Sequence, residues 1–252
     1  MHKYFAKPLF LGKKVEFLPE CHSTNEQMLL RVRKADEPEG YVVHSDHQTR
    51  GKGQRGNAWI SESGKNLLFS MLLRPKTLSI KHSYYLNLVA GLAVVSTLED
   101  EFEMKAELKW PNDVYVNDKK IAGILVETSL IGHLVEYAVV GIGLNVNQKH
   151  FSLPFATSIC MEKEVEVERE MLLEKIIAKL ESYYLLLKAS SYEKIIREYY
   201  DVMRWRGEVH QFADENGEFS GEIIGIDDIG RLLVKTFNEL RRFEVKQITF
   251  LQ

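Results

Sequence analysis

The sequence predicts an α+β protein in two parts, a larger unit of strands and helices over residues 1–204 and a small β-barrel-like unit over residues 205–252. Two observations predict this division. Up to residue 204, runs rich in β-branched residues are interspersed with segments whose apolar residues recur every three or four positions. After Trp205-Arg206-Gly207, the chain contains only short strand-like runs separated by turn residues.

The first predicted elements are a helix, two strands and a longer helix. Ser23 is followed three residues later by Glu26, the signature of a capping box, and the amphipathic stretch that follows runs to about Val32. GYVVHS (40–45) predicts a short strand, and NLLFSMLLRP (66–75) predicts a buried strand ended by a proline. Between residues 83 and 102, apolar residues spaced by three and four predict a helix.

Three further strands and two helices complete the larger unit. The strands are DVYV (113–116), KIAGILVE (120–127) and LVEYAVVGIGLNVN (134–147), and Asn117-Asp118-Lys119 is a plausible hairpin turn between the first two. Apolar periodicity predicts the helices at about 168–188 and 191–203. In the small unit, strands are expected in EVHQF, GEIIGI, RLLVKTF and FEVKQITF, with a turn at Asp227-Asp228-Ile229-Gly230.

Composition excludes several classes of protein. The 252 residues are 45% hydrophobic and carry a formal net charge of -3 with both signs dispersed, which does not support a protein that coats nucleic acid or a membrane surface. Cys21 and Cys160 are far apart and form no metal or disulfide pattern, which favours a reducing compartment. The N-terminus has no signal-peptide pattern, and no segment is long enough to span a bilayer, so a cytoplasmic location is expected.

Residues 51–56, GKGQRG, match the G-x-G-x-x-G pattern of nucleotide-binding loops. A dinucleotide fingerprint needs a helix directly after the glycines, whereas NAWISESGKNLLFS predicts a turn and a strand. No H-R-D or D-F-G follows, which argues against a protein kinase. The loop therefore predicts a flexible backbone able to approach an anionic ligand, with Lys52 and Arg55 to meet its charge.

Polar residues at strand ends provide further candidates. KWPND (109–113) precedes one strand, and Lys120 heads a strand of aliphatic residues close to Gly123, so its charge could point into a pocket. A lysine at a hairpin end that simply reaches water is the alternative. Asn145 and Asn147 end a buried strand, where their amides could bind a base edge or cap a loop.

Five motifs together resemble one family, the biotin protein ligases, also called holocarboxylase synthetases. They are STN (23–25), QTRGKGQRGNAW (48–59), KWPND (109–113), KKIAGILVE (119–127) and GIGLNVN (141–147), in the order found in the family. The resemblance implies a class II synthetase-like catalytic domain, a mixed sheet with helices, followed by a small SH3-like β-barrel domain. It also implies ATP-dependent ligation of biotin, through biotinyl-5′-AMP, to a lysine of a biotin carboxyl carrier protein domain.

The resemblance also assigns roles to residues. Lys120 is the implied catalytic residue, between the biotin carboxylate and the α-phosphate of ATP. The implied biotin-binding residues are Ser23, Thr24, Asn25, Gln48, Gly51, Lys52, Lys120 and Gly123. The implied ATP-binding residues are Gln54, Arg55, Trp59, Lys109, Asp113 and Asn145. ATP is expected with Mg²⁺, whose ligands the sequence does not identify.

Some features depart from the family or leave alternatives open. Lys52 and Gln54 stand where members carry arginine, which would weaken the grip on the adenylate. Simple alternation places Lys120 and Gly123 on opposite faces of their strand, so either Gly123 contributes its backbone or the strand bulges. The capping box alone would also explain Ser23.

The resemblance also bears on partners. Only 22 residues precede Ser23, so no DNA-binding winged helix and no nucleic-acid partner are expected. A homodimer is possible, and an edge of the catalytic-domain sheet is expected to receive the carrier or a second copy of the chain. The related lipoate ligases and octanoyl transferases are the alternative family, but the GKGQRGNAW and KWPND motifs favour biotin.

Overall fold

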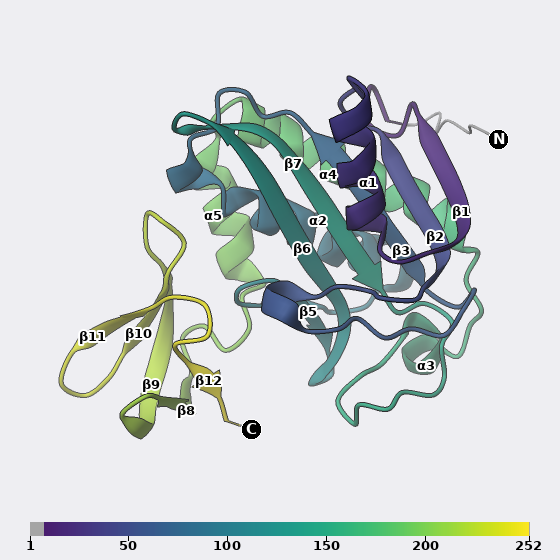
Figure 1. Cartoon of the computed structure of the whole chain (residues 1–252). Coiled ribbons are helices and arrows are strands. Elements are labelled where there is room, and N and C mark those ends of the chain that lie inside the picture. The colour runs from purple at the N-terminus through teal and green to yellow at the C-terminus, as the bar shows by residue number, and fades with distance from the viewer. Residues whose placement is uncertain (1–7, 252) are drawn as a thin grey trace.

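The chain forms one seven-stranded sheet with helices and one separate five-stranded sheet (Figure 1). The computed structural model describes residues 8–251, except for the side chain of Arg55. The large sheet has the order β1-β2-β3-β7-β6-β5-β4. Its strands are β1 (Val15–Cys21), β2 (Val42–Gln48), β3 (Leu67–Leu73), β4 (Glu107–Lys109), β5 (Asp113–Val116), β6 (Lys119–Ile131) and β7 (Leu134–Leu144). Because β1 and β2 are parallel and the other neighbours antiparallel, the sheet is mixed, as predicted.

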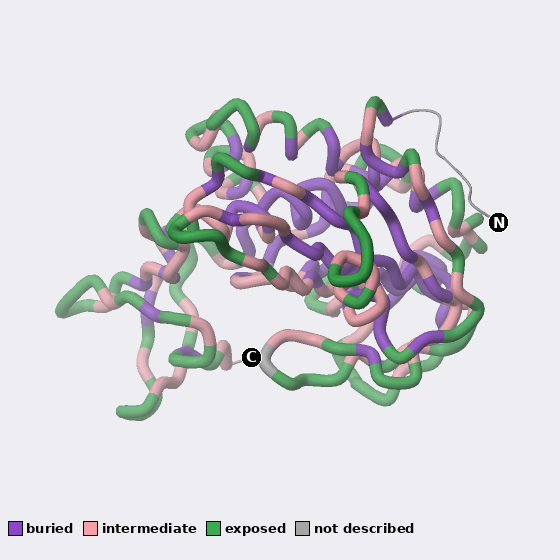
Figure 2. Tube along the Cα trace, turned by 45° about the horizontal axis from the view of Figure 1, so that its top comes forward, coloured by how far each residue is buried: buried purple, intermediate pink, exposed green. Residues whose placement is uncertain are grey.

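Helices cover both faces of this sheet. They are α1 (Thr24–Lys34), α2 (Tyr85–Phe102), α3 (Ile159–Lys163), α4 (Arg169–Lys188) and α5 (Tyr192–Asp201). In Figure 1, α1 lies in front of the sheet, and α2, α4 and α5 lie behind it. The central strand β3 is consequently buried along its whole length, which explains its unbroken apolar run. Figure 2 shows the same concentration of buried residues in the central strands and the helices behind them.

The sequence missed three elements of this unit. The edge strand β1 (VEFLPEC) is buried only at its two ends and shows no regular alternation of apolar and polar residues, and β4 and α3 are each five residues or shorter. None of them shows the sustained apolar period on which the prediction rests. The remaining helices and strands lie where the sequence placed them, and Asn117 and Asp118 form the predicted hairpin turn, both with positive φ.

The small unit is an antiparallel sheet of order β11-β10-β9-β8-β12. Its strands are β8 (Val209–Asp214), β9 (Gly217–Ile226), β10 (Leu232–Lys235), β11 (Leu240–Phe243) and β12 (Thr249–Phe250). The turn at Asp227 is formed as predicted, because the Asp227 carboxylate accepts the backbone N–H groups of Ile229 and Arg231. FEVKQITF does not form one strand: β11 ends at Phe243, and a turn precedes β12. The domain boundary at residues 204 and 205 stays a prediction; it falls between α5 and β8.

Direct contacts hold the small sheet against the large unit. The Trp110 indole N–H donates to the Gly230 carbonyl at 3.0 Å, and Lys81 forms an ion pair with Asp228 at 2.5 Å. The Tyr200 hydroxyl donates to the Ile226 carbonyl at 3.1 Å. These contacts hold the end of β9 and the turn between β9 and β10 against the large unit. Among the described residues, no helix combines the length and apolar character needed to cross a bilayer.

A buried carboxylate fixes the first described segment of the chain. Glu181 of α4 is 4% exposed, and its two oxygens accept the backbone N–H groups of Leu9, Phe10 and Leu11 at 2.5–2.8 Å. Three consecutive backbone donors that would otherwise lack partners are satisfied by one side chain. The segment before β1 is therefore attached to the helical layer behind the sheet.

We predict that Glu181→Ala lowers the free energy of unfolding by about 2–4 kcal/mol, because three partly or fully buried N–H groups lose their acceptor. Chemical denaturation followed by circular dichroism measures this change. Glu181→Gln is the matched control: it keeps the shape and one acceptor oxygen, and should be less destabilising. If the alanine variant is no less stable than the glutamine variant, the proposed anchoring role is wrong.

Candidate active site

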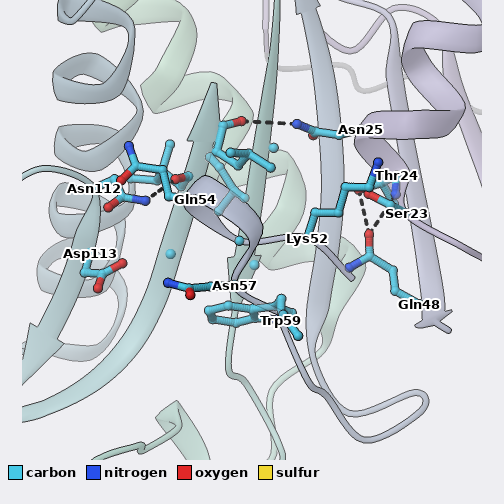
Figure 3. Close-up of a pocket in the computed structure, with 18 of the residues that line it drawn as sticks. Ser23, Thr24, Asn25, Gln48, Lys52, Gln54, Asn57, Trp59, Asn112 and Asp113 are labelled. Atoms are coloured by element: carbon cyan, nitrogen blue, oxygen red, sulfur yellow. Dashed lines mark hydrogen bonds between the residues drawn. The ribbon is translucent and has the colours of Figure 1, made fainter. Parts of the chain in front are cut away.

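A cavity of about 170 Å³ lies on the front face of the large sheet (Figure 3). Its walls are the start of α1, the loop of residues 51–59, the middle of β6 and β7, and the turn after β11. The residues that line it are Ser23, Thr24, Asn25, Gln48, Lys52, Gly53, Gln54, Asn57, Ala58, Trp59, Asn112, Asp113, Lys120, Gly123, Ile124, Leu125, Gly141, Ile142, Gly143, Val245 and Lys246. Ten of the fourteen predicted site residues lie in this lining, although they come from segments distant in the sequence.

One end of the cavity is polar and buried. Ser23, Thr24 and Asn25 are each less than 5% exposed at the start of α1. Ser23 occupies the N-cap position, but its side chain makes no capping hydrogen bond, so the predicted capping box is wrong. Instead, Gln48 Oε1 on β2 accepts the Thr24 N–H at 2.7 Å, as Figure 3 shows. A neighbouring strand satisfies the first turn of the helix, and the Ser23 hydroxyl is left to the cavity.

The glycine loop is a small hairpin. The Trp59 N–H donates to the Gly51 carbonyl at 2.9 Å, and the Gly53 N–H donates to the Asn57 carbonyl at 2.7 Å. A 3-10 turn over Gln54–Gly56 joins the two arms, and no longer helix follows. The prediction that this is not a dinucleotide-binding turn is therefore confirmed. Gly51 is buried beneath the opposite arm, where a β-carbon would overlap the Trp59 carbonyl oxygen.

Trp59 lies flat on a surface of bare strand backbone. A β-carbon on Gly143 would come within 2.5 Å of Trp59 Cε2, and one on Gly123 within 3.0 Å of Cζ3. These two glycines are directly paired across β6 and β7. The indole Nε1 is buried without a hydrogen-bond partner among the described residues. A buried donor with no partner beside a cavity is a candidate group for binding a ligand acceptor.

A β-bulge places Lys120 and Gly123 on the same face of β6. The β5–β6 register shifts after Val114, so Tyr115 pairs with Lys120 and Val114 with Ala122. The Lys120 Nζ consequently lies 3.5 Å from where a β-carbon of Gly123 would be. Of the two alternatives left open by the sequence, the bulge is correct. Lys120 does not simply extend into water, because its ammonium pairs with Asp113 Oδ1 at 2.7 Å and lies 5.6 Å from the Trp59 ring.

Four predicted residues do not line the cavity or cannot be placed there. Gly51 lies beneath the hairpin, and the side chain of Arg55 lies outside the described part of the chain. The Lys109 ammonium lies over the Phe250 and Tyr115 rings, at 4.7 and 5.1 Å, and burial lowers its pKa although the nearby Asp113 charge opposes this. The Asn145 amide donates to the Thr157 carbonyl at 2.9 Å and thereby holds the next segment of chain.

Other cavity residues were missed by the sequence analysis. Asn112 lines the cavity, and its amide donates to the Ile124 carbonyl at 2.6 Å. Gly141 lies beneath Asn25, and Lys246 arrives from the small sheet. The alternation Gly141-x-Gly143 was a usable signal, because two glycines spaced by two leave one strand face bare. No local signal could have identified Lys246, which depends on how the two sheets pack.

The cavity contains little that could bind a metal ion directly. Asp113 is the only carboxylate among the described residues that line it. In the described part of the chain, no cluster of three or more histidine, cysteine or acidic side chains could hold a metal. A divalent cation would therefore have to arrive largely coordinated by a ligand such as a polyphosphate.

Two family models match the chain. The model of the biotin/lipoate A/B protein ligase family matches residues 18–145, about half of the chain, and that of the biotin protein ligase C-terminal domain matches residues 211–245. The chain belongs to the biotin protein ligase family. The resemblance carried by the five motifs is confirmed, and so is the fold class predicted from it.

Several named proteins are similar to this chain over most of its length. The bifunctional ligase/repressor BirA of Bacillus subtilis is 29% identical over 225 residues, which cover 87% of this chain and 69% of that protein. A biotin–[acetyl-CoA-carboxylase] ligase of Mycobacterium tuberculosis is 29% identical over 174 residues, which cover 68% of this chain and 64% of that protein. A solved biotin protein ligase from Aquifex aeolicus, in complex with biotin and ATP, superposes with a TM-score of 0.78 at 28% identity, covering 94% of this chain and 98% of that one.

We predict that Gly143→Ala displaces the Trp59 ring, because the added methyl would occupy the position of Cε2. In a background where Trp110 and Trp205 are replaced by phenylalanine, Trp59 is the only tryptophan, and its emission should shift to longer wavelength as the ring leaves the strand surface. Gly53→Ala, at a site with more room, is the control. An unchanged emission spectrum in the Gly143 variant would show that the ring does not rest on this glycine.

Proposed function

We propose that this protein ligates biotin to a specific lysine of a biotin carboxyl carrier protein domain, using ATP and forming biotinyl-5′-AMP as intermediate. One observation carries the proposal: the buried polar groups at the start of α1 and the paired Lys120 line opposite ends of the same cavity. That arrangement suits a ligand with a polar head and a carboxylate. A lipoate or octanoate ligase is disfavoured, because its linear acyl chain would leave the buried polar groups unpaired.

The chain's own residues act by binding and by electrostatic stabilisation. Ser23, Thr24, Asn25 and Gln48 hold the ureido ring, while Lys52 and Gly123 enclose the valeryl side of the ligand. Gly51 acts indirectly, because it lets the two arms of the hairpin approach each other. The Lys120 ammonium meets the biotin carboxylate and the negative charge that develops on the α-phosphate of ATP. The carboxylate oxygen then displaces pyrophosphate from the α-phosphorus. In the second step the carrier amine attacks the acyl carbon of the mixed anhydride, and AMP leaves.

The nucleotide is assigned to the side of the cavity near the hairpin loop. Gln54, Trp59 and Asp113 line that side, and the partnerless Trp59 Nε1 can donate to a ligand oxygen or nitrogen. Asn145 and Lys109 are proposed to act from its margin, whereas the predicted role of Arg55 falls on a side chain outside the described part of the chain. Mg²⁺ fits as a companion of ATP, since it is usually held by phosphates and one or two carboxylates, here Asp113. Calorimetry of Trp59→Ala with ATP and with biotin alone tests this placement; loss of biotin binding only would overturn it.

The experiment that tests the function is biotin-dependent exchange of pyrophosphate into ATP. Exchange with biotin, and none with lipoate or octanoate, is the expected result. Exchange that depends on lipoate instead would replace the proposal by its alternative. Transfer to a carrier domain, followed by mass spectrometry, tests the second step.

Lys120→Ala should lower the rate of adenylation by about 10²–10³-fold or more, because a fixed positive charge is lost where negative charge develops. Folding should be little affected, because the Lys120 side chain is only partly buried and its loss leaves Asp113 in contact with solvent. Lys119→Ala, next to it and exposed, should be nearly silent. Equal exchange rates for the Lys120 variant and the unmodified enzyme would remove Lys120 from the mechanism.

The proposed partner is the carrier domain, received at an edge of the large sheet. β5 pairs with β6 only as far as Gly123, so on that side residues 125–131 of β6 have no strand partner within the described chain. An open strand edge can accept an extended segment by β-augmentation, either from a carrier or from a second copy. Sedimentation velocity distinguishes monomer from homodimer. A cytoplasmic location, and the absence of nucleic-acid and membrane partners, stay predictions from composition.

A further inference from the structure

A chain of hydrogen bonds leads from a carboxylate outside the cavity to its polar end. Glu127 of β6 accepts the Asn25 amide N–H at 2.8 Å, and the Leu125 carbonyl accepts from the same amide at 3.3 Å. The Ser70 hydroxyl, on β3, lies 2.6 Å from Asn25 Oδ1 and 2.7 Å from Thr24 Oγ1. Ser70 is fully buried, and neither it nor Glu127 lines the cavity.

Glu127 and the Leu125 carbonyl, at the outer end of these linked hydrogen bonds, determine which groups donate and which accept. A carboxylate and a backbone carbonyl can only accept, so the Asn25 amide nitrogen must face them, and Oδ1 must face Ser70. The Ser70 hydroxyl donates to Asn25 Oδ1 and is also the donor in its 2.7 Å contact with Thr24 Oγ1. Because Thr24 Oγ1 accepts from Ser70, its own proton is directed away from Ser70, to Gln48 Oε1 at 3.1 Å.

The groups that face this end of the cavity consequently have fixed roles as hydrogen-bond donors or acceptors. With its proton directed to Gln48 Oε1, Thr24 Oγ1 offers a lone pair to a ligand. Gln48 Oε1 accepts the Thr24 backbone N–H, so the Gln48 amide nitrogen remains as a donor. The orientation of Asn25 also depends on Gly141, where any β-carbon would overlap Oδ1.

We propose that Ser70 and Glu127 are positioning residues that set the hydrogen-bond direction at this end of the cavity. They make Thr24 an acceptor and Gln48 a donor, the complement of a cyclic urea, which presents N–H groups beside a carbonyl oxygen. The proposal rests on the proposed biotin ligation and deepens it, because it explains selection of the ureido ring through two residues that do not touch the ligand. A site with fixed polarity rejects analogues that cannot match it more strongly than an apolar pocket does.

The first test compares Michaelis constants in the pyrophosphate-exchange assay. Ser70→Ala removes the donor that holds Thr24 Oγ1 as an acceptor, so the KM for biotin should rise about three- to tenfold while the KM for ATP stays unchanged. Glu127→Gln keeps the shape but allows the amide to donate, and should shift the biotin KM in the same direction by a smaller factor. Ser129→Ala and Glu136→Gln are matched controls, since this serine–glutamate pair (2.8 Å) lies outside the cavity lining.

The second test uses a biotin analogue in which oxygen replaces one ureido N–H, prepared as both isomers. The unmodified enzyme should discriminate against at least one isomer, because Thr24 Oγ1 and the new ring oxygen are both acceptors. In Ser70→Ala the Thr24 hydroxyl no longer accepts from Ser70 and can turn its proton toward that oxygen, so the ratio of the two KM values should fall about threefold or more. A role in stability alone would leave this ratio unchanged.

The outcomes distinguish a failure of the proposed function from a failure of the roles proposed for Ser70 and Glu127. Absence of biotin-dependent exchange in the unmodified enzyme would refute the proposed function itself. Normal exchange, with a folded Ser70→Ala variant whose biotin KM and discrimination ratio are unchanged, would overturn the roles of Ser70 and Glu127. Equal increases in the KM of biotin and ATP would also overturn them. If thermal melting shows that Ser70→Ala does not fold, Glu127→Gln decides by the same criteria.

Discussion

Three glycines on one face of β6 and β7 are the constraint on which the site depends. Gly123 and Gly143 are paired across the two strands, and Gly141 follows the alternation on the same face. Side chains at these positions would fill the space that Trp59 and Asn25 occupy. The bare face lets two other segments, the glycine hairpin and the start of α1, approach the sheet closely. The cavity is the space enclosed between these segments and the part of the sheet where the three glycines carry no side chains.

The same sheet decides the electrostatics of the cavity. The bulge in β6 turns Lys120 toward the glycine face, and its pairing with Asp113 places one positive and one negative charge beside Trp59. Both side chains of this pair are partly exposed, so solvent screens their charges, and a ligand that covers them would strengthen their interaction with its own charge. At the opposite end the groups at the start of α1 are polar and uncharged, and Lys52 of the hairpin loop lies beside them (Figure 3). The cavity therefore has one end with a lysine–aspartate pair and one end dominated by hydrogen-bonding groups.

The small sheet also contributes to the wall of the cavity. Val245 and Lys246 extend the cavity wall from the turn after β11, and the Trp110–Gly230 hydrogen bond holds another turn of the same sheet, between β9 and β10, against the large unit. Trp110 itself follows β4 directly, next to the two polar residues that line the cavity, Asn112 and Asp113. The KWPND segment thus serves two contacts: its first half holds the small sheet, and its second half faces the ligand.

The sequence by itself determined the elements with a strong apolar period and the identity of the family. β3, α2 and α4 could be predicted because burial imposes a period on every residue of a long element. The five motifs placed Lys120, Gln48 and the start of α1 in one site because the family repeats them in that order. Local patterns did not predict β1, which lacks a regular alternation, or β4 and α3, which are short.

Only the tertiary structure decided which partner each polar group has. Ser23 carries a capping-box pattern, yet Gln48, 24 residues beyond Thr24, caps the helix instead. Asn25 and Glu127 meet across 102 residues of chain, and Asn145 binds the Thr157 carbonyl. A hydrogen bond depends on distances of tenths of an ångström between groups that the sheet brings together, and sequence spacing contains no information at that scale. The residue types were therefore readable from the sequence, whereas their pairing was set by strand register, by one bulge and by the contact between the two sheets.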